Sequence, residues 1–150
     1  MYTDGACSNN GRGNPRGGWG AVLISSNGYR LKIADRLEGD IITNNRAELT
    51  AVIRALEALK SPAEVHLTTD SEYVLKGATQ WLPGWKRKDW KTAAKKPVKN
   101  ADLWREIDRL MPTHKVFFHW VRGHSGHPEN DLADHLAVAG ANGKTVREYE

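Results

Sequence analysis

Four acidic residues in separate parts of the chain could together bind a divalent metal ion; they are Asp4, Glu48, Asp70 and Asp134. Carboxylates that converge on one site repel one another unless a cation neutralises them. A site made only of oxygen ligands suits a hard ion such as Mg2+ or Mn2+, whereas Zn2+ is typically held by nitrogen and sulfur ligands. The spacing of these residues does not by itself show that they converge.

Asp70 comes at the end of an alternating run, VHLTTDSEYV. Val65 and Leu67 share one face of the predicted strand, so Asp70 follows a buried segment, where an unpaired charge is unfavourable. The alternative is a helix N-cap, with a short helix that follows and ends at Gly77. For an isolated aspartate the cap is the more common role, so a catalytic interpretation requires partners elsewhere in the chain.

Glu48 lies in the segment TNNRAELTAVIRALEALK, which predicts an amphipathic helix with Thr43 or Asn44 as its N-cap. The apolar residues recur at helical spacing, at Leu49, Val52, Ile53, Leu56 and Leu59. Glu48 falls on the same side as Val52 and Leu56, which places a carboxylate on the core-facing stripe. The alternative is a solvated acid in the first turns that the helix dipole stabilises.

A basic segment rich in tryptophan indicates a polyanionic partner. The chain has 22 Lys and Arg against 18 Asp and Glu, and seven of the basic residues lie in KRKDWKTAAKKPVK, residues 86–99, with one acid, Asp89. Trp81, Trp85 and Trp90 lie in or beside this run. Cations that alternate with aromatic rings suit a nucleic-acid strand, whose phosphates and bases they can contact. The alternative is a merely solvated loop.

The remaining elements predict a single α/β domain over residues 1–150. Two strand-like runs, residues 19–25 and 29–37, flank a Ser-Asn-Gly turn and predict a hairpin. Further strands are expected at residues 65–70 and 115–121, and further helices at 100–111 and from about Pro128. A hairpin followed by alternating helices and strands implies a mixed sheet with helices against it, with the basic segment as an insertion.

Several classes of protein are excluded by composition. The single cysteine, Cys7, rules out a disulfide framework within the chain and fits a reducing compartment. There is no signal-peptide pattern, and no apolar run approaches the roughly 20 residues that span a bilayer, so we expect a cytoplasmic protein without a membrane partner. GKT at 143–145 lacks the glycine of a P-loop, because position 138 is valine.

Five segments in order resemble a type 1 ribonuclease H of the bacterial kind with a basic protrusion, from Tyr2 to about Ala141. They are YTDGACSNNG, TNNRAEL, TTDSEYV, WLPGWKRKDWKTAAKKPVKNADLW and VRGHSGHPENDLADHLA. The resemblance implies a ribonuclease H-like fold, a five-stranded mixed sheet with helices on both faces. It also implies an endoribonuclease that hydrolyses the RNA strand of RNA/DNA hybrids by two-metal-ion catalysis and leaves 5'-phosphate and 3'-hydroxyl ends. The cofactor implied is Mg2+, two ions, with Mn2+ as a substitute.

The same resemblance assigns roles to individual residues. Asp4, Glu48, Asp70 and Asp134 would be the catalytic metal ligands, and His124 a mobile residue for proton transfer or product release. The hybrid-binding residues would be Asn10, Thr43, Asn44, Asn45, Tyr73, Trp81, Trp85, Lys86, Arg87, Lys88, Trp90, Lys91, Lys95, Lys96 and Lys99. Alternatives remain for three of these: simple exposure for His124, core packing for Trp81, and Asn14 in place of Asn10 as the loop contact. The protein is expected to be a monomer.

Three positions depart from the family pattern. Only three residues precede Asp4, so either the first strand is unusually short or this start is not the native one. Ile41 replaces an arginine near a DNA phosphate, for which Arg46 or the basic segment would compensate. Glu72 stands where several members have glutamine, and its charge would oppose phosphates.

Two rival functions fit the pattern less well. A binding module that had lost catalysis would lack one of the carboxylates, and all four are present. A strand-transfer enzyme of the transposase or integrase kind would differ in acid spacing and would lack the GHxGxxxN loop.

Overall fold

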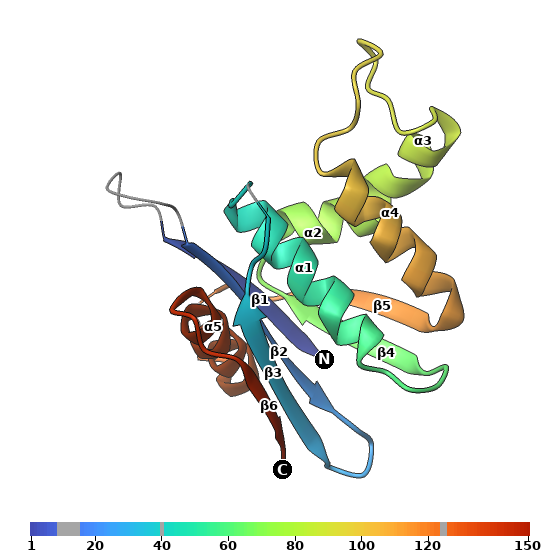
Figure 1. The fold of residues 1–150 in the computed structure, drawn as a ribbon. Coiled ribbons are helices and arrows are strands. Elements are labelled where there is room, and N and C mark those ends of the chain that lie inside the picture. Colours follow the sequence, from blue (N-terminus) through green and yellow to red (C-terminus); the bar gives the residue numbers. More distant parts are fainter. Residues whose placement is uncertain (9–15, 40, 124–125) are drawn as a thin grey trace.

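The computed structural model describes residues 1–8, 16–39, 41–123 and 126–150. Its centre is a mixed sheet in the order β5-β4-β1-β2-β3-β6 (Figure 1). The strands are β1 (Tyr2–Ser8), β2 (Arg16–Ile24), β3 (Arg30–Arg36), β4 (Glu64–Thr69), β5 (Lys115–Trp120) and β6 (Val146–Tyr149). β1, β2 and β3 pair antiparallel, whereas β1–β4 and β4–β5 are parallel. The predicted α/β class and the β2–β3 hairpin are confirmed.

The sheet has six strands among the described residues, where five were predicted. The additional strand is β6, which pairs antiparallel with the outer edge of β3. Its sequence, VREY, is short and largely exposed, so it has none of the buried alternation by which a strand is recognised. Charge supports the pairing instead, because the Nζ of Lys32 lies 3.3 Å from Glu148 and 2.6 Å from Glu150.

Helices cover both faces of the sheet, as predicted (Figure 1). Helix α1 (Asn44–Glu57) packs on one face of β1 and β2, and α5 (Pro128–Ala141) packs across β1, β2 and β3 on the other. Helix α4 (Ala101–Leu110) lies beside α1 and is followed by the 3-10 turn η2 (Met111–Thr113). None of the helices in the described ranges is both long enough and apolar enough to cross a membrane.

The main core lies between the sheet and the α1 side, where buried residues of several elements pack together. They are Leu49, Val52, Ile53, Leu56, Val65, Leu67, Val74, Leu82, Trp104 and Ile107. The apolar stripe of α1 and the alternation of β4 are therefore confirmed. Trp104 of α4 is fully buried in this core.

The short helix α2 (Glu72–Lys76) ends at Gly77, its C-cap, as predicted, but the helical path of the chain does not stop there. The chain continues through a π-helical turn, η1 (Gly77–Trp81), into α3 (Leu82–Arg87). Gly77 has an ordinary helical φ of −59°, and its Cα lies against the Trp104 ring, so that a β-carbon there would collide with the indole. Glycine is required at this position for close packing.

Candidate active site

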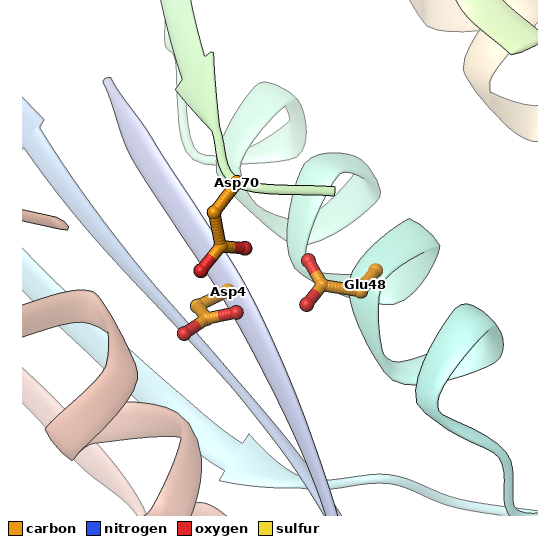
Figure 2. Close-up of side chains that lie close together, drawn as sticks. All are labelled: Asp4, Glu48 and Asp70. Carbon is orange, nitrogen blue, oxygen red and sulfur yellow. The ribbon is translucent and has the colours of Figure 1, made fainter. Parts of the chain in front are cut away.

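Three carboxylates meet between β1, α1 and the end of β4 (Figure 2). Each of Asp4, Glu48 and Asp70 offers an oxygen, and these oxygens all lie within 4.8 Å of one another. Asp4 projects from the middle strand β1, Glu48 from the second turn of α1, and Asp70 from the residue that follows β4. Asp4 is 4% exposed and Glu48 8% exposed, whereas Asp70 is half-buried. Three elements that are distant in sequence therefore place negative groups in one partly desolvated site.

Close packing of α1 on β1 brings Glu48 to Asp4. Gly5 follows Asp4 and faces the helix, and a β-carbon on Gly5 would stand 2.5 Å from the backbone nitrogen of Glu48. Any larger residue would therefore push α1 away from the strand. The Gly5 N–H also donates to Oδ1 of Asp4 at 2.9 Å, which fixes the carboxylate on its own strand.

Helix α5 adds a fourth carboxylate and an amide. Asp134 is half-buried, contacts the carboxyl of Asp4, and interacts electrostatically with Asp70. Asn130 lies one turn earlier on the same helix, is 1% exposed, and hydrogen-bonds to the side chain of Asp70. The predicted motif GHxGxxxNxxxD contains both residues, but no role was predicted for Asn130. Its spacing of four residues from Asp134 is the signal that places both on one side of the helix.

The alternative role of Asp70 as a helix cap is wrong. The N-cap of α2 is Ser71, whose Oγ accepts from the Val74 N–H at 3.1 Å. The Ser71 N–H in turn donates to Thr69 Oγ1 at 3.0 Å. Because Ser71 caps α2, the Asp70 carboxylate is not needed for the cap and can face Asp4.

Two residues from the β5–α5 side hold Asp70 in place. Trp120 donates its indole N–H to the main-chain carbonyl of Asp70 at 3.1 Å. Gly123 lies against the Asp70 side chain, since a β-carbon on Gly123 would stand 2.8 Å from Oδ2. Neither residue was predicted to support the site.

Burial and mutual repulsion favour protonation of the cluster. Burial raises the pKa of Asp4 to about 7; the charge of Asp70 and contact with Asp134 add to the rise, whereas a hydrogen bond with Glu48 partly opposes it. Burial is likewise the main cause that raises the pKa of Glu48 well above its usual value, and the contact with Asp4 adds to the rise. Burial also raises the pKa of Asp70, and the Asn130 contact partly offsets this. A bound cation would reverse these shifts by stabilising the ionised forms.

The donor set fits a hard divalent cation. All ligands are carboxylate oxygens, which suits Mg2+ or Mn2+. Oε2 of Glu48 is buried and has no hydrogen-bond partner among the described residues, which is unfavourable unless a cation or water meets it. Oxygens of Asp4 and Asp70 lie within 4.8 Å of a carboxylate oxygen of Glu48.

Three of the predicted hybrid-binding residues, Thr43, Asn44 and Asn45, lie at the start of α1. Thr43 is the N-cap, because its Oγ1 accepts from the Arg46 N–H at 3.1 Å; this decides between Thr43 and Asn44. Asn44 is exposed and Asn45 half-buried in the first turn. The predicted loop contact Asn10, like the catalytic candidate His124, lies outside the described residues.

Arg46, one of the residues expected to compensate for Ile41, is held by an acid of α4. Its guanidinium makes a two-pronged ion pair with Asp102, at 3.0 Å and 2.7 Å, and its side chain is 17% exposed. Ile41 itself is 62% exposed.

The cations of the basic segment are exposed. They are Lys86, Arg87, Lys88, Lys91, Lys95, Lys96 and Lys99. Of these, Lys86 forms an ion pair with Asp108 at 3.2 Å. Glu72, which was expected to oppose phosphates, has a 64% exposed side chain and lies 3.5 Å from the Nζ of Lys76.

The aromatic residues of this region form a connected cluster of rings. Trp85 lies 5.4 Å from Trp104, 5.9 Å from Trp81 and 6.4 Å from Trp90, measured between ring centroids. Trp81 is 38% exposed, so it packs against other rings and also reaches the surface. The hydroxyl of Tyr73 points inward and accepts hydrogen bonds at 3.1 Å and 3.0 Å.

Comparison with known proteins gives a consistent result. The family model described as RNase H matches residues 1–142. A protein named Ribonuclease H from Cupriavidus pinatubonensis is 56% identical over 141 residues, which are 93% of this chain and 92% of that protein. The crystal structure of LC9-RNase H1, a type 1 RNase H with the type 2 active-site motif, superposes with a TM-score of 0.81 at 34% identity, covering 96% of this chain and 72% of that one. The foamy viral protease-reverse transcriptase in complex with RNA/DNA hybrid shares the fold, with a TM-score of 0.72 at 23% identity over 93% of this chain and 19% of that one.

Proposed function

The chain belongs to the RNase H family, and we propose that it is an endoribonuclease that hydrolyses the RNA strand of RNA/DNA hybrids. The observation that carries the proposal is the convergence of three carboxylates from β1, α1 and the end of β4, with a buried Glu48 oxygen that has no hydrogen-bond partner in the part of the chain that the structure describes. Such a site is suited to a divalent cation and to little else. The hybrid as substrate follows from family membership, since the likeness to the reverse transcriptase supports the fold alone.

Asp4, Glu48, Asp70 and Asp134 would hold two Mg2+ ions, or Mn2+ in their place. The ions would supply positive charge for the attacking and leaving oxygens of an in-line displacement at phosphorus, with products that carry 5'-phosphate and 3'-hydroxyl ends. Asp4 is suited to a shared position because it contacts Glu48, Asp70 and Asp134 at once. Asn130, Trp120 and Gly123 would hold Asp70 so that its carboxylate stays in a fixed orientation. Fixed ligands reduce the reorganisation that reaction would otherwise require.

His124 is proposed as the residue that transfers a proton or assists product release. It belongs to the segment that connects β5 to α5, and this segment also contributes Gly123 to the site. An imidazole has an ordinary pKa close to neutrality, which suits it to such a role.

The substrate would lie across the start of α1 and the basic segment. Asn44 and Asn45 would meet the RNA strand, because an amide can both donate to and accept from a 2'-hydroxyl. Thr43 and the exposed lysines would contact DNA phosphates, and Trp81, Trp85 and Trp90 would provide ring faces. We propose further that residues 1–150 act as one domain, as a monomer, in the cytoplasm; the lone Cys7, which is free, is compatible with a reducing compartment.

The test uses labelled RNA annealed to DNA, with either Mg2+ or EDTA. Wild type should cut the RNA strand with Mg2+ and leave RNA/RNA and DNA/DNA duplexes intact. Asp70→Asn should reduce cleavage by at least about a hundredfold, because one ligand is lost from the centre. Asp131→Asn, which removes an acid of α5 outside the cluster, is the matched control and should cut at the wild-type rate. Intact RNA with both Mg2+ and Mn2+, or full activity of Asp70→Asn, would refute the proposal, and hybrid binding without cleavage would favour the binding-module alternative.

A further inference from the structure

Two histidines meet on the outer strands of the sheet. His66 belongs to β4 and His119 to β5, the outermost strand in the sheet order, and Nδ1 of His66 lies 2.9 Å from Nε2 of His119. In the parallel ladder His119 pairs with Thr68, two residues beyond His66, so the two imidazoles are diagonal neighbours. One ring from each strand therefore contributes a nitrogen to the pair.

The pair lies on the side of the sheet that faces away from the main core. His66 alternates with Val65 and Leu67, which pack in that core, so its side chain points to the opposite side. On that side α5 packs across β1, β2 and β3. His66 and His119 are both exposed, and Phe117 between them is 37% exposed. Both imidazoles can therefore be reached from solvent.

The two imidazoles are nearly coplanar, and a third ring packs against one of them. The ring centroids of His66 and His119 are 5.2 Å apart and their planes are inclined by 23°. Because the facing nitrogens are much closer together than the centroids, the rings meet through their nitrogen edges. His66 also stacks on Phe117 at 16°, with centroids 5.0 Å apart. Rings that packing already restricts lose less freedom when a ligand binds.

Two imidazole nitrogens at this separation can bind one metal ion. Metal–nitrogen bonds of about 2.0–2.1 Å at right angles, as on a tetragonal ion, place two nitrogens about 2.9 Å apart. The spacing of His66 and His119 is the same, and turns of the two exposed rings would direct both lone pairs to one ion. Imidazole suits Cu2+, Ni2+ and Zn2+, whereas Mg2+ prefers oxygen ligands.

The charge of this part of the sheet is mixed. The Nζ of Lys115 lies 5.5 Å from the centroid of Phe117, the ring that stacks on His66, and Glu64 stands opposite Lys115 in the ladder. One ammonium and one carboxylate give little net attraction for a cation. An ion at this place must therefore be held by direct bonds to nitrogen, which favours a transition metal over Mg2+.

We propose that His66 and His119 form a surface site for a divalent transition-metal ion, with Cu2+ bound most tightly and Ni2+ and Zn2+ more weakly. The ion would join β4 to β5, and water or a small ligand from solution would complete its coordination. Each histidine would bind as a neutral imidazole through the nitrogen that now faces its neighbour. The competing explanation is that the two rings form only a hydrogen bond with each other.

Isothermal titration calorimetry with CuCl2 at about pH 7.5 tests the site, with about 10 mM MgCl2 present to occupy the carboxylate cluster. His66→Gln and His119→Gln each remove one nitrogen. Each should weaken Cu2+ binding at least about tenfold, because the second ligand of a pair binds the ion intramolecularly. His127→Gln is the matched control, since His127 is an exposed histidine at the N-cap of α5. It should bind Cu2+ within about twofold of wild type.

Electron paramagnetic resonance of the protein with one equivalent of Cu2+ gives a second measurement, which does not depend on any variant. Wild type should show two coordinated imidazole nitrogens, and each single variant should show one. A wild-type spectrum with fewer than two nitrogens would overturn the proposal, as would affinities of His66→Gln and His119→Gln within about threefold of wild type. Equal weakening in His127→Gln would also overturn it, because Cu2+ would then bind elsewhere. Neither measurement uses a nucleic acid, so the result is independent of whether the protein cleaves hybrids.

Discussion

Gly123 lies so close to Asp70 that a β-carbon on the glycine would stand 2.8 Å from Oδ2 of the carboxylate. The residue that follows β4 and the loop that follows β5 are therefore packed against each other at the metal-binding site. We predict that Gly123→Ala lowers cleavage of the hybrid about tenfold or more, because the carboxylate must shift by a few tenths of an ångström and catalysis is sensitive to such shifts. The melting temperature should change little, since the end of an aspartate side chain can move cheaply. Wild-type activity in this variant would show that Asp70 is not held by this contact.

The carboxylate cluster should destabilise the metal-free protein at neutral pH. The pKa of Asp4 rises from its ordinary 3.8 to about 7 on folding, mainly through burial, so the folded state binds a proton more tightly than the unfolded chain. Below pH 3.8 both states are protonated and there is no penalty. As the pH rises from about 4 to about 7 the penalty accumulates, and above pH 7 it is complete.

Asp4→Asn should therefore raise stability in EDTA at pH 8 while abolishing activity. We expect a gain of about 1–3 kcal/mol, or about 3 to 10 °C in Tm, which shrinks toward zero at pH 4. Thermal melts followed by circular dichroism at several pH values measure this. A variant less stable than wild type at pH 8 would contradict the inferred repulsion.

Addition of Mg2+ should stabilise wild type, because the ion binds the folded cluster and not the unfolded chain. A gain of about 1 kcal/mol, or about 3 °C, is expected at 10 mM Mg2+ for millimolar binding. Asp70→Asn should lose most of this gain, whereas Asp131→Asn should keep it. Sodium chloride at matched ionic strength is the control for screening, and an equal rise with NaCl would argue against a specific metal site.

Glu72→Gln should lower KM for the hybrid at low salt. The Glu72 side chain is 64% exposed, and its ion pair with Lys76 at 3.5 Å is open to solvent and therefore weak, so much of its charge still opposes an approaching phosphate. The expected change is about two- to threefold, and it should vanish as salt screens the charge. A KM that is unchanged at low salt would place Glu72 away from the duplex.

Sequence patterns predicted which strand or helix carries each carboxylate, but they did not predict that the carboxylates meet in one site. The alternation before Asp70 and the stripe that includes Glu48 are local features, and both are confirmed. The approach of α1 to β1 depends on the missing side chain of Gly5, a contact between distant segments that no local pattern reports. The prediction that the acids form one site came only from the resemblance to the ribonuclease H family.

Other features escaped prediction for related reasons. Gly77 ends α2 as its sequence indicates, but the chain continues in the π-helical turn η1, and the space beside the Gly77 Cα is filled by the Trp104 ring. Strand β6 is held by edge pairing and by ion pairs of Lys32 rather than by apolar burial. In both examples the structure depends on contacts between residues far apart in the sequence, which a local sequence pattern does not contain.

Beyond the amino end of β1, β4 has β5 on one side but, in the described ranges, no partner strand on the other. Among the described residues, the β1–β4 ladder consists of the pair Tyr2–Thr68, and beyond it the Met1 amino group donates to the His66 carbonyl at 3.0 Å. A cavity of about 600 Å³ opens beside Met1, with Leu23, Leu59 and Val65 among its lining residues. Burial lowers the pKa of the Met1 amine, which indicates that a charged group sits unfavourably at this edge.

Three residues added before Met1 should therefore continue β1 between β2 and β4 and raise Tm. In this register they lie opposite His66, Val65 and Glu64, and the middle one shares the α1 face with Met1, toward Leu59. A Thr-Val-Thr extension should raise Tm by about 2 to 5 °C, because it buries an apolar side chain and moves the charged amine out of the sheet. Thr-Asp-Thr is the matched control and should give no gain, since it directs a carboxylate into the apolar cavity. Equal melting temperatures for the two extensions would mean that the added residues do not enter the sheet. The short pairing of β1 with β4 would then not limit how firmly β1 holds Asp4.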